Sequence, residues 1–218
     1  MNINWYGQSC FQISSTRGKD NQVSIVIDPF DENTTGLKLP KLQADILLVT
    51  HDHSDHSNIK AVSGQPFVIK GPGEYDIKRS FIQGISGHHD NTQGTQRGSI
   101  TIYTIEAEGI RICHLSDLGQ KELTSGQLDK IGDVDILMIP VGGVYTIDAV
   151  EAVKIMAQVE PRVIIPMHYN IPKLKIKLGD VDKFLKNLGI KKPESLPRLS
   201  IKKKDISTEE AKVIILQP

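Results

Sequence analysis

The chain has 218 residues, of which 39% are hydrophobic and 24% are charged, the composition of an ordinary globular protein. Lysine plus arginine equals aspartate plus glutamate, at 26 each, so no net charge favours nucleic acid or an acidic membrane surface. No apolar run reaches the roughly 18 residues that a membrane span needs.

The first half of the chain predicts mainly β-strands. β-Favouring residues gather in short runs separated by turn residues, and one run ends at Asp28-Pro29, a typical stop for a buried strand. Another apolar run, at 46–50, leads directly into a segment rich in histidine. The expected strands cover residues 2–6, 10–14, 23–27, 46–50, 67–70, 80–85, 100–106 and 111–114.

The second half predicts helices that alternate with strands. Apolar residues at helical spacing predict a helix over 146–159 and a second helix over 181–188, with Gly189 as its stop. Apolar strands at 134–140 and 162–167 flank the first helix, and this order predicts that the two strands are parallel. The whole pattern favours two sheets packed face to face under outer helices.

The cysteines, the N-terminal stretch and the absence of linkers bear on redox state, cellular location and domain number. Cys10 and Cys113 fit no metal or redox spacing, so we expect both to be reduced core residues. The N-terminal stretch has no basic segment followed by an apolar one, so we expect no signal peptide and a cytoplasmic location. We find no repeat or linker, and we interpret residues 1–218 as a single domain.

The most informative segment is residues 51–56, His-Asp-His-Ser-Asp-His, which holds three of the seven histidines. Imidazoles and carboxylates crowded on one loop are costly as plain structure, and a pair of divalent metal ions removes that cost. In extended backbone, His51 and His53 would point the same way and share one ion. Asp55 and His56 would then face a second ion, so the segment predicts a metal-dependent hydrolase.

Six residues cannot fill two coordination spheres, so we expect further ligands from other strand ends. His88 and His89 follow one strand and should point to opposite sides, so at most one of them is a ligand. If Asp117 faces the metals, His114 faces away, and we interpret His114 as a hydrogen-bonded core imidazole. His168 also follows an apolar strand, and chemistry alone leaves its role open.

The pattern His51-X-His53-X-Asp55-His56 after a hydrophobic strand resembles the signature of the metallo-β-lactamase superfamily. Further blocks that resemble the family are Trp5 to Cys10, Ile27 to Phe30, His89-Asp90 with Arg97-Gly98, His114 to Gly119, Pro140 to Gly143 and Ile165 to Tyr169. Together they are similar to small bacterial and archaeal metal-dependent hydrolases related to L-ascorbate-6-phosphate lactonase. The resemblance implies an α/β fold, a four-layer αββα sandwich, for almost the whole chain.

The resemblance also implies a role for each clustered residue. The first metal would be held by His51, His53 and His89, and the second by Asp55, His56 and His168, with Asp117 bridging both. Asp55 would also be catalytic, accepting a hydrogen bond from the bridging water. Imidazole and carboxylate ligands without thiolate suit two divalent ions, with zinc favoured and manganese or iron tolerated.

Two residues depart from the family pattern. Ser116 stands where glycine usually precedes the bridging aspartate, which would alter the turn that aims Asp117. Ile100 falls close to a position that is often asparagine, which concerns the outer pocket rather than the metals.

Substrate recognition is less determined by the sequence. Four side chains in or near the motif-bearing loops are candidates to bind a carboxylate or phosphate, namely Arg97, Tyr145, Tyr169 and Lys173. Residues 170–178 predict either a mobile lip over the site or an edge strand that lysines protect against aggregation.

Three functions are compatible with these residues. Hydrolysis of a small ester, lactone or phosphoester is the leading hypothesis, with a small molecule as substrate. A nuclease or phosphodiesterase acting on nucleic acid is the second, and the balanced charge and 5% aromatic content weigh against a nucleic-acid partner. A non-catalytic metal-binding sensor is the third. We expect no membrane partner, and exposed strands would permit a homo-oligomer.

Overall fold

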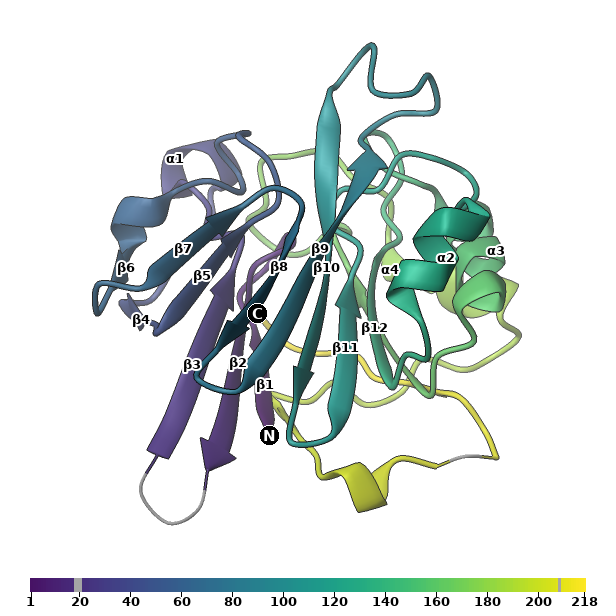
Figure 1. Ribbon diagram of the computed structural model, residues 1–218. Helices are drawn as coiled ribbons and strands as arrows, with labels where there is room; N and C mark the ends of the chain where they lie inside the picture. Colours follow the sequence, from purple (N-terminus) through teal and green to yellow (C-terminus); the bar gives the residue numbers. More distant parts are fainter. Residues whose placement is uncertain (18–20, 208) are drawn as a thin grey trace.

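The computed structural model describes residues 1–17, 21–207 and 209–218, and within these residues the backbone forms two large mixed β-sheets (Figure 1). The first sheet has the spatial order β14 (Leu199–Ser200), β1 (Asn2–Trp5), β2 (Phe11–Arg17), β3 (Asn21–Ile27), β5 (Ile46–Val49) and β7 (Phe67–Lys70). The second has the order β15 (Lys212–Val213), β13 (Val163–Met167), β12 (Ile136–Pro140), β11 (Ile110–His114), β10 (Ser99–Ala107), β9 (Ser80–His88) and β8 (Gly73–Ile77). A short separate ladder joins β4 (Leu42–Gln43) to β6 (Val62–Ser63).

Strand direction brings several strand ends to one edge of the molecule. In the first sheet, β1, β3 and β5 run the same way, because β1 and β3 both pair antiparallel with β2 and β3 pairs parallel with β5. In the second sheet, β9, β11, β12 and β13 also share one direction. The parallel pairing of β12 with β13 is the one that the sequence predicts. The carboxyl ends of these strands carry the site described below.

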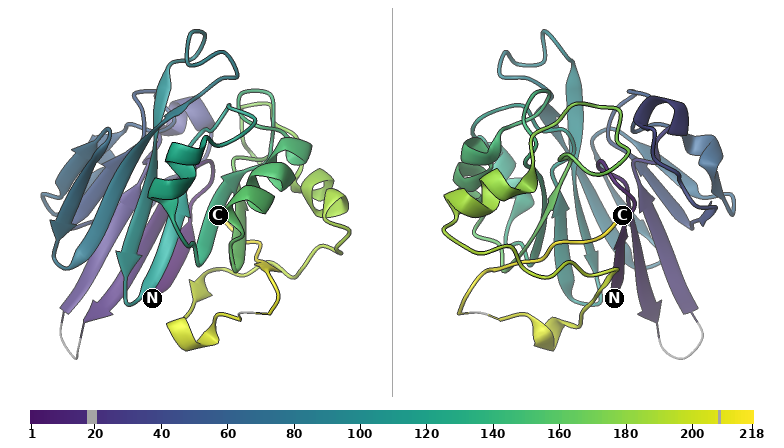
Figure 2. Two further views of the ribbon diagram at one scale, coloured as in Figure 1. Left: turned by 45° about the vertical axis from the view of Figure 1, so that its right-hand side comes forward. Right: turned by 180° about the vertical axis from the view of Figure 1, so that it is seen from behind.

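Helices cover the two sheets unequally. The helices α2 (Ser125–Ile131), α3 (Ala149–Val159) and α4 (Val181–Asn187) pack together on the outer side of the seven-stranded sheet (Figures 1 and 2). Within the described residues, the helices on the far side of the six-stranded sheet are the short α1 (Glu32–Thr35) and η1 (Ile59–Ala61), while η2 (Lys203–Asp205) belongs to the C-terminal segment. The arrangement is an α/β sandwich with one thick and one thin helical layer.

The core lies between the sheets and under the helices. In β5 and β12 every residue is buried, which explains why these strands read as continuous apolar runs rather than as alternating ones. Helix α3 buries Ala149, Ala152 and Ile155 on one face, whereas Val150, one of the apolar residues whose spacing predicts the helix, is 53% exposed. The cysteines are free and buried, as expected.

The strands and helices expected from the sequence are present to within a few residues at each end, and several short elements were missed. Strand β8 is largely polar, and α2 is too short to show a clear period. Residues 170–178 contain no strand, so the edge-strand interpretation of that segment is wrong. Among the described residues, no helix is both long enough and apolar enough to cross a membrane.

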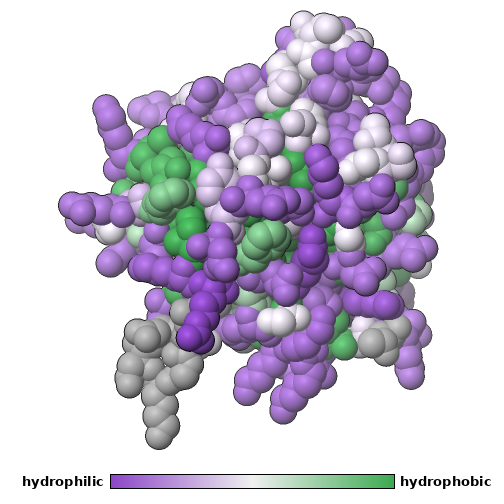
Figure 3. Space-filling model, in the orientation of Figure 1, coloured by the Kyte–Doolittle hydropathy of each residue, from purple (hydrophilic) through white to green (hydrophobic). Residues whose placement is uncertain are grey.

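The surface is mostly hydrophilic, and an exposed apolar region lies at a sheet edge. Phe67 and Val68 of the terminal strand β7 are 53% and 39% exposed. Figure 3 shows apolar side chains gathered on the side of the molecule where this strand lies.

Candidate metal centre

The structure brings all seven sequence-predicted site residues together where the strand ends meet. The segment after β5 supplies four of them, and single residues follow β9, β11 and β13. They form two clusters, in each of which one ligand atom per residue lies within 4.8 Å of the others. We refer to His51, His53 and His89 as the histidine group and to Asp55, His56, Asp117 and His168 as the mixed group.

The histidine group converges through a bend rather than through an extended strand. Residues 51–56 form bends and turns, so the alternation expected for His51 and His53 is not what aligns them. The Nε2 atom of His51 nevertheless lies 3.1 Å from Nδ1 of His53. Two imidazole nitrogens on one tetrahedral zinc ion are about 3.3 Å apart, given Zn–N bonds of about 2.0 Å. The pair is therefore spaced as two ligands of one ion would be.

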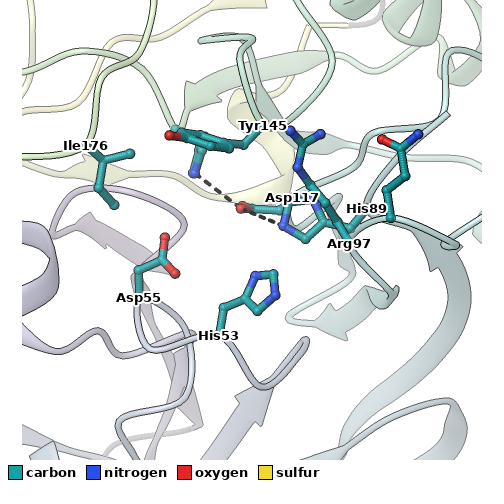
Figure 4. A pocket seen from close by; sticks show the side chains of 9 residues that line it. His53, Asp55, His89, Arg97, Asp117, Tyr145 and Ile176 are labelled. Atoms are coloured by element: carbon teal, nitrogen blue, oxygen red, sulfur yellow. Dashed lines mark ion pairs between the residues drawn. The ribbon is translucent and has the colours of Figure 1, made fainter.

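Asp117 lies between the two groups. Its Oδ2 atom is 3.2 Å from Nε2 of both His56 and His168. It is 3.6 Å from Nε2 of His89, a pair that Figure 4 marks with a dashed line. Its other oxygen, Oδ1, accepts a hydrogen bond of 3.0 Å from the Ser9 hydroxyl, which the turn after β1 supplies. One carboxylate thus touches both groups while a buried hydroxyl fixes its orientation.

Asp28, at the end of β3, supports the mixed group from behind. Its Oδ2 atom accepts a hydrogen bond of 2.9 Å from Nδ1 of His56, so Nε2 of that ring is left free to face Asp117. The backbone N–H and the hydroxyl of Thr50 donate to the same carboxylate, at 2.8 and 2.7 Å. The sequence indicated a strand stop at Asp28 and a block that resembles the family from Ile27 to Phe30, but not this contact with His56.

Thr50 connects this support to the histidine group. Because its single hydroxyl hydrogen goes to Asp28, its oxygen accepts from Ser116 Oγ at 2.7 Å and from His51 Nδ1 at 3.0 Å. Nδ1 of His51 therefore carries the proton, and Nε2 is left with the lone pair that a metal needs. Ser116 adopts a φ of 55°, a left-handed conformation that glycine takes without strain. The serine thus keeps the turn that aims Asp117.

Two glycines let neighbouring loops pack against the ligand-bearing backbone. A Cβ atom added at Gly119 would lie 2.3 Å from the carbonyl oxygen of His89. At Gly142 it would lie 2.2 Å from the carbonyl oxygen of His168. No larger residue fits at either position without moving a candidate ligand.

Burial and neighbouring charge set the protonation of the site. Burial lowers the pKa of His51 to about 2. Burial alone would raise the pKa of Asp117, but His168 and His56 hold it well below its usual value. Burial alone would lower the pKa of His56, but the carboxylates of Asp117 and Asp28 hold this pKa well above its usual value. The mixed group is thus a site of ionised carboxylates that requires positive charge beside it.

The chemistry of the donor atoms fits divalent metal ions. Nε2 of His56 is buried and makes no hydrogen bond, although it points toward the oxygen of Asp117. Such an orphaned nitrogen is costly unless another partner binds it, and a metal ion is such a partner. The donors are imidazole nitrogens and carboxylate oxygens, a set that suits zinc and also tolerates manganese or iron.

Two histidines stay outside both groups. His114 is fully buried, and its Nδ1 accepts from the Ser116 N–H at 3.2 Å while Nε2 donates to the Ser9 carbonyl at 3.0 Å. This confirms the interpretation of His114 as a hydrogen-bonded core imidazole. His88 belongs to neither cluster, so only His89 of that pair joins the site.

A cavity of about 450 Å³ opens over the centre. The side chains that line it are His53, Asp55, His89, Gln96, Arg97, Asp117, Tyr145, His168 and Ile176. Arg97 and Tyr145 thus reach the cavity as the sequence suggested, and Ile176 shows that the segment 170–178 contributes to its wall.

Three residues singled out in the sequence do not line this cavity. The ring of Tyr169 is buried against Trp5, with centroids 5.1 Å apart, so its candidacy for substrate recognition is wrong. Lys173 also lies outside the cavity wall. Ile100 is buried in β10, so this departure from the family pattern does not shape the cavity.

Sequence reasoning missed the residues that orient the ligands. Ser9, Asp28 and Thr50 each follow a strand whose end lies at the site, which is the same signal that identified the ligands. Applying that signal to every strand end, rather than only to those with histidine, would have found them.

Comparison with known proteins agrees with this geometry. A family model described as a beta-lactamase superfamily domain matches residues 2–168, which include all seven clustered residues. A UPF0173 metal-dependent hydrolase of Thermoplasma volcanium is 32% identical, over 77% of this chain and 83% of the relative. Its counterpart in Thermoplasma acidophilum is 30% identical, over 78% of this chain and 84% of the relative.

A solved structure shows the same fold. The protein comes from Thermotoga maritima and is inferred to be a zinc-dependent hydrolase of the metallo-β-lactamase superfamily. It is 34% identical, covers 99% of both chains and superimposes with a TM-score of 0.78. The expected sandwich fold is confirmed, and this chain belongs to the metallo-β-lactamase superfamily and, with these relatives, to the UPF0173 family of metal-dependent hydrolases.

Proposed function

We propose that this protein hydrolyses a small ester, lactone or phosphoester at a centre of two divalent metal ions, with zinc as the expected metal. The observation that carries the proposal is the position of Asp117, whose Oδ2 atom lies 3.2–3.6 Å from imidazole nitrogens of both groups. A carboxylate in that position suits a ligand shared between two ions.

The residues divide naturally between two ions. The histidine group would hold one and the mixed group the other, with Asp117 between them. When bound, two such ions lower the pKa of a shared water and polarise the carbonyl or phosphoryl oxygen of the substrate.

The chain's own residues prepare that reaction. Asp55 lines the cavity and is partly exposed, so its carboxylate can accept a hydrogen bond from the attacking water and orient it. Asp28 and Thr50 fix the rings of His56 and His51 with Nε2 free, so the donor atoms need little rearrangement.

The size of the cavity supports a small substrate. About 450 Å³ lies at the lower end of the range typical of small-molecule sites. Lactone opening, the reaction suggested by the resemblance to the ascorbate-phosphate lactonases, is the first reaction to test. No feature of the cavity favours the nuclease alternative.

The test is a substrate screen on protein reconstituted separately with zinc, manganese and iron. The panel contains lactones, carboxyl esters, thioesters, phosphomonoesters and phosphodiesters. We expect turnover of a small member of the panel, abolished in Asp55→Ala without loss of the far-ultraviolet circular dichroism spectrum. Wild-type activity in Asp55→Ala would refute the assigned role of Asp55.

Asp52→Ala is the matched control. Asp52 lies in the same loop, is exposed and pairs with Lys70 at 3.3 Å, outside both groups. We expect this variant to keep its activity. Turnover restricted to oligonucleotides would instead favour the nuclease reading, and two retained metals without any turnover would favour the sensor.

A further inference from the structure

Among the residues that line the cavity, Arg97 is the one ionic side chain that belongs to neither metal-ligand group. Its companions on that part of the wall, Gln96, Tyr145 and Ile176, are neutral. In the view of Figure 4, the guanidinium group of Arg97 and the ring of Tyr145 lie above Asp117, whereas His53 and Asp55 lie below it. Arg97 and the candidate metal ligands therefore share the lining of one cavity.

The loop that carries Arg97 is held in place by a carboxylate. Asp90 Oδ2 accepts from the backbone N–H groups of Gln96 and Arg97, at 3.0 and 2.8 Å. Asp90 Oδ1 accepts from the backbone and the hydroxyl of Thr92, at 2.8 and 2.7 Å. Since Asp90 directly follows His89, one short loop fixes both a candidate ligand and the arginine.

The guanidinium is positioned but not neutralised. It lies 5.5 Å from the centroid of the Tyr145 ring, and Nη2 donates a long hydrogen bond of 3.5 Å to the Val144 carbonyl. Among the described residues, no carboxylate forms an ion pair with Arg97. A stacked arginine without an anionic partner keeps most of its N–H donors available to a bound molecule.

The local charge balance favours an anion at this position. The carboxylates in the cavity, Asp55 and Asp117, are occupied by the histidines of the centre and would be offset by divalent ions. Arg97 then adds a positive charge that no carboxylate of the cavity pairs with, and its guanidinium matches carboxylate and phosphate oxygens in a bidentate manner. We propose that Arg97 binds an oxyanion group that the substrate carries apart from its scissile bond, a role that rests on the proposed hydrolase function. The substrate is then a small ester or lactone bearing a carboxylate or phosphate.

Binding of two inert probes to the zinc-reconstituted protein tests this specificity without requiring turnover. The probes are cis-cyclopentane-1,3-dicarboxylate and its monoamide, which differ in one negative charge but hardly in shape. Calorimetric titration of the wild type should show about 10- to 100-fold tighter binding of the dicarboxylate, the range for a hydrogen bond between charged groups. Replacing one carboxylate of the probe by a phosphonate shows whether carboxylate or phosphate is preferred.

The variants assign the preference to one side chain. Arg97→Gln should bring the two probes to within about twofold of each other, by weakening only the dicarboxylate. Arg97→Lys should keep part of the preference, because it retains the charge but loses the planar fork. Arg198→Gln, at an exposed arginine outside the cavity wall, should behave like the wild type. Equal weakening of both probes in Arg97→Gln, or no change in either, would overturn the proposal.

Activity separates this proposal from the hydrolase function on which it rests. If Arg97→Gln hydrolyses γ-butyrolactone-5-carboxylate as well as the wild type does, the hydrolase function stands and the recognition role of Arg97 fails. If the wild type hydrolyses nothing but its probe preference depends on Arg97, the recognition role stands and the hydrolase function fails.

Discussion

The histidine group and the mixed group are held by the protein in different ways. In the histidine group His53 is exposed and lines the cavity, and the hydroxyl of Thr50 supports only the ring of His51. Three of the four residues of the mixed group, His56, Asp117 and His168, are at most 2% exposed, whereas in the histidine group only His89 is that deeply buried. Asp28, which accepts a buried hydrogen bond from His56, and Ser9, which donates one to Asp117, hold the mixed group from two separate strand ends.

The difference indicates that the two groups bind metal ions with different affinities. Two carboxylates give the mixed group the stronger attraction for a cation, and its buried support reduces the rearrangement that binding requires. The histidine group contains no carboxylate, and its His53 is exposed at the cavity. We therefore expect the mixed group to bind its metal first and more tightly, and the histidine group to complete the centre.

The largest effect should come from the residue that the two groups share. Asp117→Asn removes the negative charge between them, so the protein should retain at most one metal ion per chain. The value of kcat/KM should fall by on the order of a thousandfold, because the activation of water depends on both ions. Metal content by plasma mass spectrometry, together with kinetics on the substrate found in the screen, checks this. Two tightly held ions with normal turnover would contradict the shared role.

A smaller effect is expected from the support behind the mixed group. Asp28→Asn replaces the carboxylate that fixes His56 by an amide, and should weaken metal binding there by about 10- to 100-fold. Competition with a chromophoric chelator measures the affinity of each group. Asp76→Asn, at an exposed position on β8, is the control and should change nothing. A loss confined to the histidine group would contradict the comparison.

The smallest of these effects should follow from loss of one hydroxyl. Ser9→Ala removes the hydrogen bond to Oδ1 of Asp117 but leaves the ligand in place. We expect roughly a three- to tenfold loss of metal affinity in the mixed group, the usual value of one such bond. The same chelator titration applies. An effect as large as that of Asp28→Asn would mean that Ser9 does more than orient the carboxylate.

The sequence predicted the ligand-bearing strand ends better than it predicted their support. His89, Asp117 and His168 were candidates because each follows a strand and is a residue type that binds metal, and the family resemblance then selected His89 over His88 and assigned His168. The bond from Ser9 to Asp117 joins residues 108 apart in the chain, and no local pattern reveals such a pairing. Ser116 looked like a defect in the sequence, yet its positive φ and its bond to Thr50 show that the turn is preserved.

The missed elements have a similar explanation. Helix α2 spans only Ser125–Ile131, so its period is hard to see, although Thr124 and Gln127 form a capping box that marks its start. Strand β8 pairs along one edge only and is mostly polar, so alternation gives little signal there.

The most direct test of the dinuclear centre is the zinc content per chain after reconstitution and gel filtration. Wild-type protein and the variants His53→Ala and His168→Ala, one from each group, are measured together. We expect two zinc ions for the wild type, and one for His53→Ala that is retained in the mixed group. For His168→Ala we expect one ion or none. A wild-type protein that holds no zinc, or whose zinc content is unchanged in both variants, would contradict the dinuclear centre.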